Sequence, residues 1–146
     1  MSLPGLTRQS IGRFNSGMSL DDLPPELRPT HSVDIALPSG RRFALQHCRP
    51  TFESWQGKPH AFSFGKKPFL NYDGTPVFAE ILILRLLESA GWQGVWVSSY
   101  GGVKFLREMP LDTKLGGVEL PYPQQKLISL ISEKVGGRGG CLDIFA

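Results

Sequence analysis

Two acidic residues, Glu80 and Asp143, have sequence surroundings that could support chemistry. When residues 77–90 are wound into a helix at 100° per residue, Glu80 falls between Leu84 and Leu87, inside the apolar arc. A carboxylate in that position is costly unless a cation, a metal or a hydrogen-bond donor meets it. Two interpretations stay open: Glu80 faces a functional site, or its stem lies along the core while its head reaches water.

Asp143 interrupts an apolar segment, between Leu142 and Ile144, directly after the glycine-rich run at residues 136–140. A carboxylate at the start of a strand supplies the hard oxygen ligands that Mg²⁺ prefers. The alternative is a solvent-facing aspartate that supports the turn. Taken together, Glu80 and Asp143 form a candidate catalytic pair that would hold Mg²⁺ or Mn²⁺.

Basic residues form the second candidate set. Lys58, Lys66 and Lys67 are interleaved with phenylalanine and tyrosine in the irregular stretch of residues 49–72, and Arg138 lies within the glycine run. Cations beside aromatic rings can neutralise phosphates and stack on bases, so these four residues are candidates for nucleic-acid binding. A loop pinned to the core by its phenylalanines, and a flexible turn around Arg138, are the structural alternatives.

Composition and missing motifs exclude several classes. The chain has 146 residues and a net charge of +3, with +4 in residues 1–72 and −1 in residues 73–146. Glycine-rich nucleotide-binding fingerprints, a nucleophile-elbow motif and zinc-ligand spacings are absent. Cys48 and Cys141 are expected to be reduced, no apolar run is long enough to cross a membrane, and we expect a cytoplasmic protein.

The elements that position these residues follow from turn and helix signals. Alternating residues 33–37 and 43–47 around Pro38-Ser39-Gly40 predict a hairpin. Thr75 as N-cap and Pro76 at the first helical position predict a helix over residues 77–90 that ends at Gly91. Strands are predicted at residues 95–100 and 103–107, a second helix at 124–135, and a final strand at 142–146.

The predicted organisation has three parts. Residues 1–30 are expected to be a flexible N-terminal arm with one short helical turn after Ser19. Residues 31–72 hold the hairpin and the basic, aromatic loop. Residues 73–146 form a partial nuclease-like core.

This order of elements resembles the front part of the PD-(D/E)xK, or restriction-endonuclease-like, nucleases over roughly residues 76–146. It is most similar to the virus-type replication-repair nuclease (VRR-NUC) branch, in which a glycine-rich approach leads to an aspartate followed by apolar residues. The resemblance implies an α/β (α+β) fold, with a mixed sheet flanked by helices. It implies that Glu80 is the carboxylate of the first core helix and that Asp143 is the metal-binding aspartate.

The family places Glu-x-Lys or Asp-x-Lys on the next strand, whereas this sequence ends three residues after Asp143. We therefore expect a core that is incomplete at its C-terminus and inactive unless that strand is supplied. The hypotheses are a metal-dependent nuclease acting on DNA, or an inactive fragment of one. The alternative is a non-catalytic module that binds nucleic acid or protein, including a homo-oligomer or a partner chain that completes the sheet.

Overall fold

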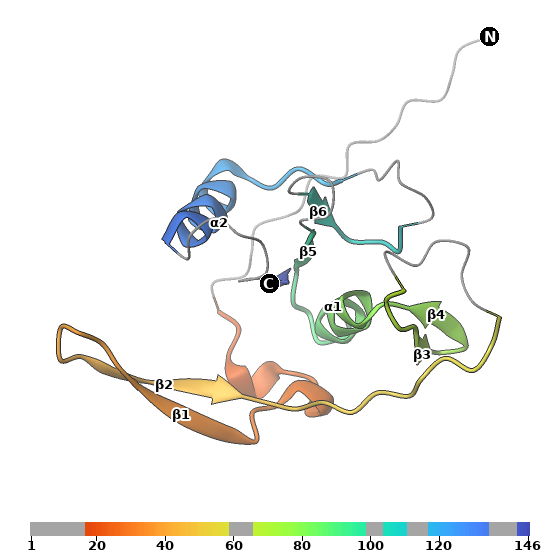
Figure 1. Cartoon of the computed structure of the whole chain (residues 1–146), viewed down its shortest axis with the longest axis horizontal. Coiled ribbons are helices and arrows are strands. Elements are labelled where there is room, and N and C mark those ends of the chain that lie inside the picture. The colour runs from red at the N-terminus through yellow and green to blue at the C-terminus, as the bar shows by residue number, and fades with distance from the viewer. Residues whose placement is uncertain (1–16, 59–65, 99–103, 111–116, 135–142) are drawn as a thin grey trace, which may run out of the picture.

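The computed structural model describes residues 17–58, 66–98, 104–110, 117–134 and 143–146. Within these ranges the chain is a mixed α/β protein with two α-helices and small antiparallel sheets (Figure 1). The α+β class predicted from the sequence is confirmed at this level. The finer prediction of a restriction-endonuclease-like arrangement stays a prediction.

The first hairpin consists of β1 (His31–Ala36) and β2 (Arg42–His47), which pair in antiparallel register from His31↔His47 to Ala36↔Arg42. Gly40, at φ +80°, supplies the left-handed residue of its turn. The sequence prediction of this hairpin is confirmed. In Figure 1 it extends away from α1 and the central strands, and both of its faces are largely exposed.

A second hairpin corrects the predicted start of the first helix. β3 (Leu70–Tyr72) pairs with β4 (Thr75–Val77) around Asp73 and Gly74, which both have positive φ, +48° and +76°. Two consecutive left-handed residues of the Asp-Gly type make a tight hairpin turn. The predicted N-cap at Thr75 is therefore wrong, because Thr75 and Pro76 belong to β4.

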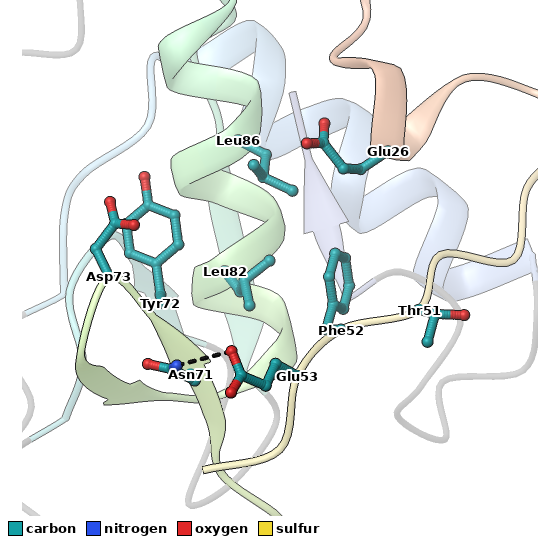
Figure 2. A pocket seen from close by; sticks show the side chains of 9 residues that line it. All are labelled: Glu26, Thr51, Phe52, Glu53, Asn71, Tyr72, Asp73, Leu82 and Leu86. Atoms are coloured by element: carbon teal, nitrogen blue, oxygen red, sulfur yellow. Dashed lines mark hydrogen bonds between the residues drawn. The ribbon is translucent and has the colours of Figure 1, made fainter.

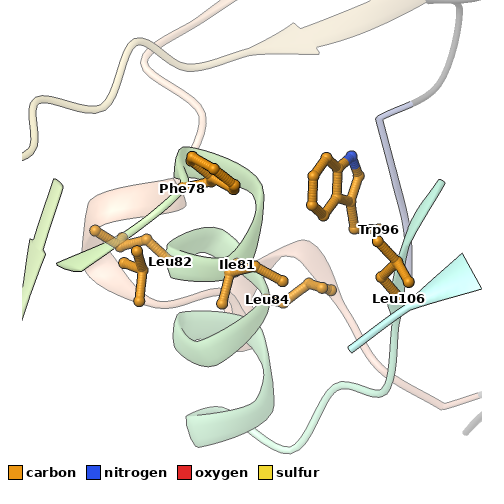
Figure 3. Close-up of a cluster of buried hydrophobic side chains, with 7 residues drawn as sticks. Phe78, Ile81, Leu82, Leu84, Trp96 and Leu106 are labelled. Carbon is orange, nitrogen blue, oxygen red and sulfur yellow. The ribbon is translucent and has the colours of Figure 1, made fainter. Parts of the chain in front are cut away.

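Helix α1 runs from Ala79 to Ser89, with Phe78 as its N-cap and no side-chain capping bond. Its end is as predicted: Gly91 adopts φ +88° and donates its N–H to the carbonyl of Glu88. The buried face of α1 packs on the largest core cluster (Figure 3), which comprises Val77, Phe78, Ile81, Leu82, Leu84, Trp96 and Leu106.

The central sheet has the order β6-β5-β7, with β5 (Val95–Ser98) antiparallel to both β6 (Lys104–Leu106) and β7 (Ile144–Phe145). The strands predicted at residues 95–100, 103–107 and 142–146 are thus confirmed where the structure describes them, at residues 95–98, 104–106 and 144–145. Residues 99, 100 and 103 lie outside the described residues. The turn at Gly101-Gly102 and Leu142 lie outside the described residues.

Alternation along β5 gives this sheet two packed faces. Trp96 belongs to the cluster on α1, whereas Val95 packs with Leu120 and with Ile128 of α2 (Tyr122–Lys134). Phe145 joins that second cluster and Ile144 joins the first. The predicted second helix is confirmed, and it covers the face of the sheet opposite α1.

Two short 3₁₀ turns precede the first hairpin, η1 (Leu20–Asp22) and η2 (Pro25–Leu27). Ser19 caps η1 through a reciprocal capping box with Asp22, which agrees with the turn predicted after Ser19. The Leu27 side chain is buried, while residues 1–16 of the predicted arm lie outside the described residues. Within the described ranges, no helix combines the length and apolar character needed to span a membrane.

Candidate functional site

Glu80 is the second residue of α1, and the structure buries it: the residue is 9% exposed. Its neighbours Ile81, the next residue, and Leu84, one turn further along the helix, belong to the hydrophobic core. The helical-arc argument therefore placed Glu80 correctly. Its position in the first turn of α1 places the residue near the positive end of the helix dipole.

The cation that meets Glu80 is Lys67, which comes from the segment before β3 and forms an ion pair with Oε1 of the carboxylate. The Lys67 ammonium also lies 4.8 Å from the centroid of the Trp96 ring and 5.6 Å from that of Phe78. The Lys67 ammonium thus combines an ion pair with a buried carboxylate and cation–π contacts with two aromatic rings. Lys67 was predicted to contact nucleic acid, whereas here it neutralises Glu80.

The second carboxylate oxygen of Glu80, Oε2, differs from Oε1 in its hydrogen bonding. Oε2 is buried and makes no hydrogen bond within the described part of the chain. An unsatisfied buried acceptor costs about 1–3 kcal/mol, and more when it is charged. A further cation or hydrogen-bond donor bound at Oε2 would account for this unsatisfied oxygen.

Asp143 lies in a bend directly before β7, with its side chain exposed. Its carbonyl accepts a hydrogen bond from the N–H of Val97, at 2.9 Å, which anchors it beside the end of β5. The next residue, Ile144, pairs with Trp96, the tryptophan whose ring contacts Lys67. Asp143 therefore lies beside β5, directly before the residue that pairs with Trp96.

The two predicted carboxylates nevertheless make separate contacts: Glu80 pairs with Lys67, whereas the main-chain carbonyl of Asp143 bonds to Val97. Ile144 packs on the α1 side of the sheet and Phe145 on the α2 side. A shared ion therefore requires the Asp143 side chain to turn around the end of β7 toward α1. Among the described residues, no group of three or more histidine, cysteine, aspartate or glutamate residues could hold a metal.

Of the other predicted nucleic-acid contacts, the structure describes Lys58 and Lys66. Lys58 and Lys66 are exposed, and Lys66 adopts φ +71°. The indole N–H of Trp55 donates to the carbonyl of Lys58, at 2.9 Å, which fixes the backbone there. Arg138 and residues 59–65 of the aromatic loop lie outside the described residues.

Sequence reasoning missed an acidic cavity of about 360 Å³ beside α1 (Figure 2). Leu82 and Leu86 of α1 line it on one side, and three carboxylates from separate segments surround it: Glu26, Glu53 and Asp73. The Glu53 carboxylate accepts a hydrogen bond from the Asn71 amide, at 2.9 Å. Because these groups converge only in three dimensions, no local sequence signal could have found them.

An ion-pair network near the C-terminal end of α1 was also not predicted. Glu88 contacts both Arg85, at 2.8 Å, and Arg107, and Arg85 reaches Glu108 at 2.5 Å. Burial disfavours the charged Glu88 carboxylate, but hydrogen bonds from Arg107 and Arg85 outweigh it, so the pKa of Glu88 is lowered below 4.5. The network ties the end of α1 to the segment after β6.

No protein-family model, curated protein or solved structure matches the chain.

Proposed function

We propose that the chain contributes to a metal-dependent phosphodiesterase acting on nucleic acid, a nuclease or an inactive part of one, in which Glu80 and Asp143 share a Mg²⁺ or Mn²⁺ ion. The observation that carries the proposal is the buried Glu80 carboxylate with an unsatisfied Oε2. A structural ion pair alone leaves that oxygen unexplained. A divalent cation would satisfy it.

The donor chemistry is suitable for such an ion. Both candidate ligands are carboxylates, the hard oxygen ligands that Mg²⁺ and Mn²⁺ favour, and Asp143 is exposed. When bound, a divalent cation would polarise a phosphoryl oxygen and acidify a bound water. In this proposal Glu80 and Asp143 hold the ion, and Lys67 orients the Glu80 carboxylate through their ion pair.

The competing interpretation makes Lys67 the permanent counter-ion of Glu80, with no metal involved. The two interpretations differ at Asp143, which has no part in the lysine–glutamate pair. Removing the Asp143 charge therefore separates them: it must weaken metal binding in the first case and change nothing in the second.

Isothermal titration calorimetry with Mn²⁺ tests the proposal on the wild type and on the isosteric variants Asp143→Asn and Glu80→Gln. We expect each variant to bind at least about tenfold more weakly, because each removes one charged ligand. The matched control is Glu133→Gln, which removes the charge of an exposed carboxylate on α2. Equal isotherms for the wild type and Asp143→Asn, with unchanged circular dichroism, would contradict a shared metal site.

A second candidate function is nucleic-acid binding without catalysis, favoured by the exposed ammonium groups of Lys58 and Lys66. Each phosphate contact contributes about −0.9 to the slope of log affinity against log salt on duplex DNA. The variant Lys58→Ala/Lys66→Ala should therefore make that slope less steep by about 2. Binding that ignores salt would exclude this function, and binding that persists in EDTA would separate it from a metal-dependent one.

A further inference from the structure

The hairpin of β1 and β2 has two chemically different faces, fixed by its register. The pairs Val33↔Leu45 and Ile35↔Phe43 lie on one side, and we call these four residues the apolar hairpin face. At the open end of the hairpin, the same side carries the rings of His31 and His47, with centroids 4.5 Å apart.

The apolar hairpin face is open to solvent. Val33 is 44% exposed, Phe43 47% and Leu45 51%, while Ile35 is half-buried. A two-stranded sheet on its own is marginally stable in water, and a contiguous apolar patch commonly marks an interaction surface. In Figure 1 the hairpin stands apart from both α-helices, so neither of them covers this face.

The lack of charge on the apolar hairpin face favours a second copy of the chain over a polyanion as its occupant. The apolar hairpin face holds no lysine, arginine, aspartate or glutamate. The charges of the hairpin strands, Asp34 and Arg42, pair with one another on the opposite face, at 3.8 Å. A polyanion such as DNA therefore finds no cation on the apolar face. A second, identical face meets it without like-charge repulsion, because neither carries a charge.

Area sets the expected strength. Strands of six residues are about 20 Å long, and two strands with their side chains make a face roughly 10 Å wide. Such a face buries a few hundred Å² per copy, below the roughly 800 Å² per partner of a stable complex. Self-association through it accordingly belongs to the weak and reversible class.

We propose that the chain forms a weak two-fold dimer in which the apolar hairpin faces of two copies pack against each other. Leu45, in the middle of β2, lies near the centre of this contact and is repeated by the symmetry. The proposal is independent of any metal or nucleic acid.

Sedimentation velocity across the micromolar to millimolar range tests it, with the wild type compared to Leu45→Glu. The substitution sets two like charges into an apolar contact, and we expect the dimer to weaken more than about tenfold. The matched control is Gln46→Glu, the adjacent exposed residue on the opposite face, paired with the neutral Ser32. It adds the same charge and should leave the dimer unchanged.

Methyl NMR of the wild type locates the contact without any variant, in case Leu45→Glu disturbs the hairpin. Concentration-dependent shifts confined to Val33, Ile35 and Leu45 would support the proposal. Shifts at the exposed Leu127 and Leu130 of α2 instead would overturn it. A monomer at every concentration would also overturn it, as would a wild type that self-associates no more than Leu45→Glu. A DNA duplex that shifts the hairpin methyls of a monomeric chain would assign the face to nucleic acid and refute the dimer.

Discussion

Replacing Lys67 with methionine removes the cation that neutralises Glu80 while keeping a side chain of similar length over Trp96 and Phe78. The carboxylate is then left without a partner in the first turn of α1, beside the largest core cluster. We expect this single substitution to lower the free energy of unfolding by about 2–3 kcal/mol.

The magnitude follows from exposure. Two unit charges 4 Å apart attract by about 4 kcal/mol at an effective dielectric constant of 20, and breaking a fully buried pair costs about 3–5 kcal/mol. The Glu80 side chain is 11% exposed and that of Lys67 is 32% exposed. Because water can reach the lysine end of the pair, the cost must fall below the buried limit. It must exceed the 0–1 kcal/mol of a surface pair.

Urea unfolding at neutral pH provides the measurement, with Lys67→Met, Glu80→Met and the double variant in one thermodynamic cycle. The double variant should lie within about 1 kcal/mol of the wild type, because it leaves no unpaired charge and no orphaned oxygen. A cost below about 0.5 kcal/mol for Lys67→Met would refute the reasoning, since a surface pair behaves in that way. Additive single costs in the double variant would refute it equally.

Two further predictions concern packing and acid stability. Because the pKa of Glu88 is lowered in the folded state, its pairing with Arg107 adds stability that is present above pH 4.5 and lost as the pH falls further. In urea unfolding, the stability advantage of the wild type over Glu88→Gln should therefore shrink between pH 6 and pH 3. A Cβ added at Gly94 would lie 2.8 Å from Cβ of Ala146. Gly94→Ala should therefore lower the free energy of unfolding in urea by about 1–3 kcal/mol. The control Gly17→Ala, where the added Cβ meets open space, should leave it unchanged.

Local signals predicted much of the fold. Pro38-Ser39-Gly40 placed the first turn and Gly91 ended the first helix, because each acts through backbone geometry within a few residues. Thr75-Pro76 misled the prediction for the same reason. A capping signal is local, but here the pairing of β4 with β3 decides the structure, and Asp73-Gly74 was its turn signal.

For the candidate site, too, local signals predicted only the features that depend on one element. The burial of Glu80 could be predicted, because it follows from the periodicity of one helix. Its partner Lys67 could not be assigned, since the intervening hairpin brings the lysine back over the start of α1. Asp143 lies in a bend before β7, and the bend decides on which side of the sheet its side chain lies relative to Glu80. The alternation of residues in the sequence does not determine the direction of a bend.

The pairing of β7 with β5 joins segments almost fifty residues apart, whereas β5 and β6 are neighbours along the chain and α1 directly precedes them. Closing a long loop loses more chain entropy than closing a short one, so we expect the helix and its adjoining hairpin to assemble early and the last strand to dock afterwards. Substitutions at Phe145 should accordingly accelerate unfolding, and those at Leu84 should slow folding. Asp143 would then reach its position beside the sheet only in the last step of folding.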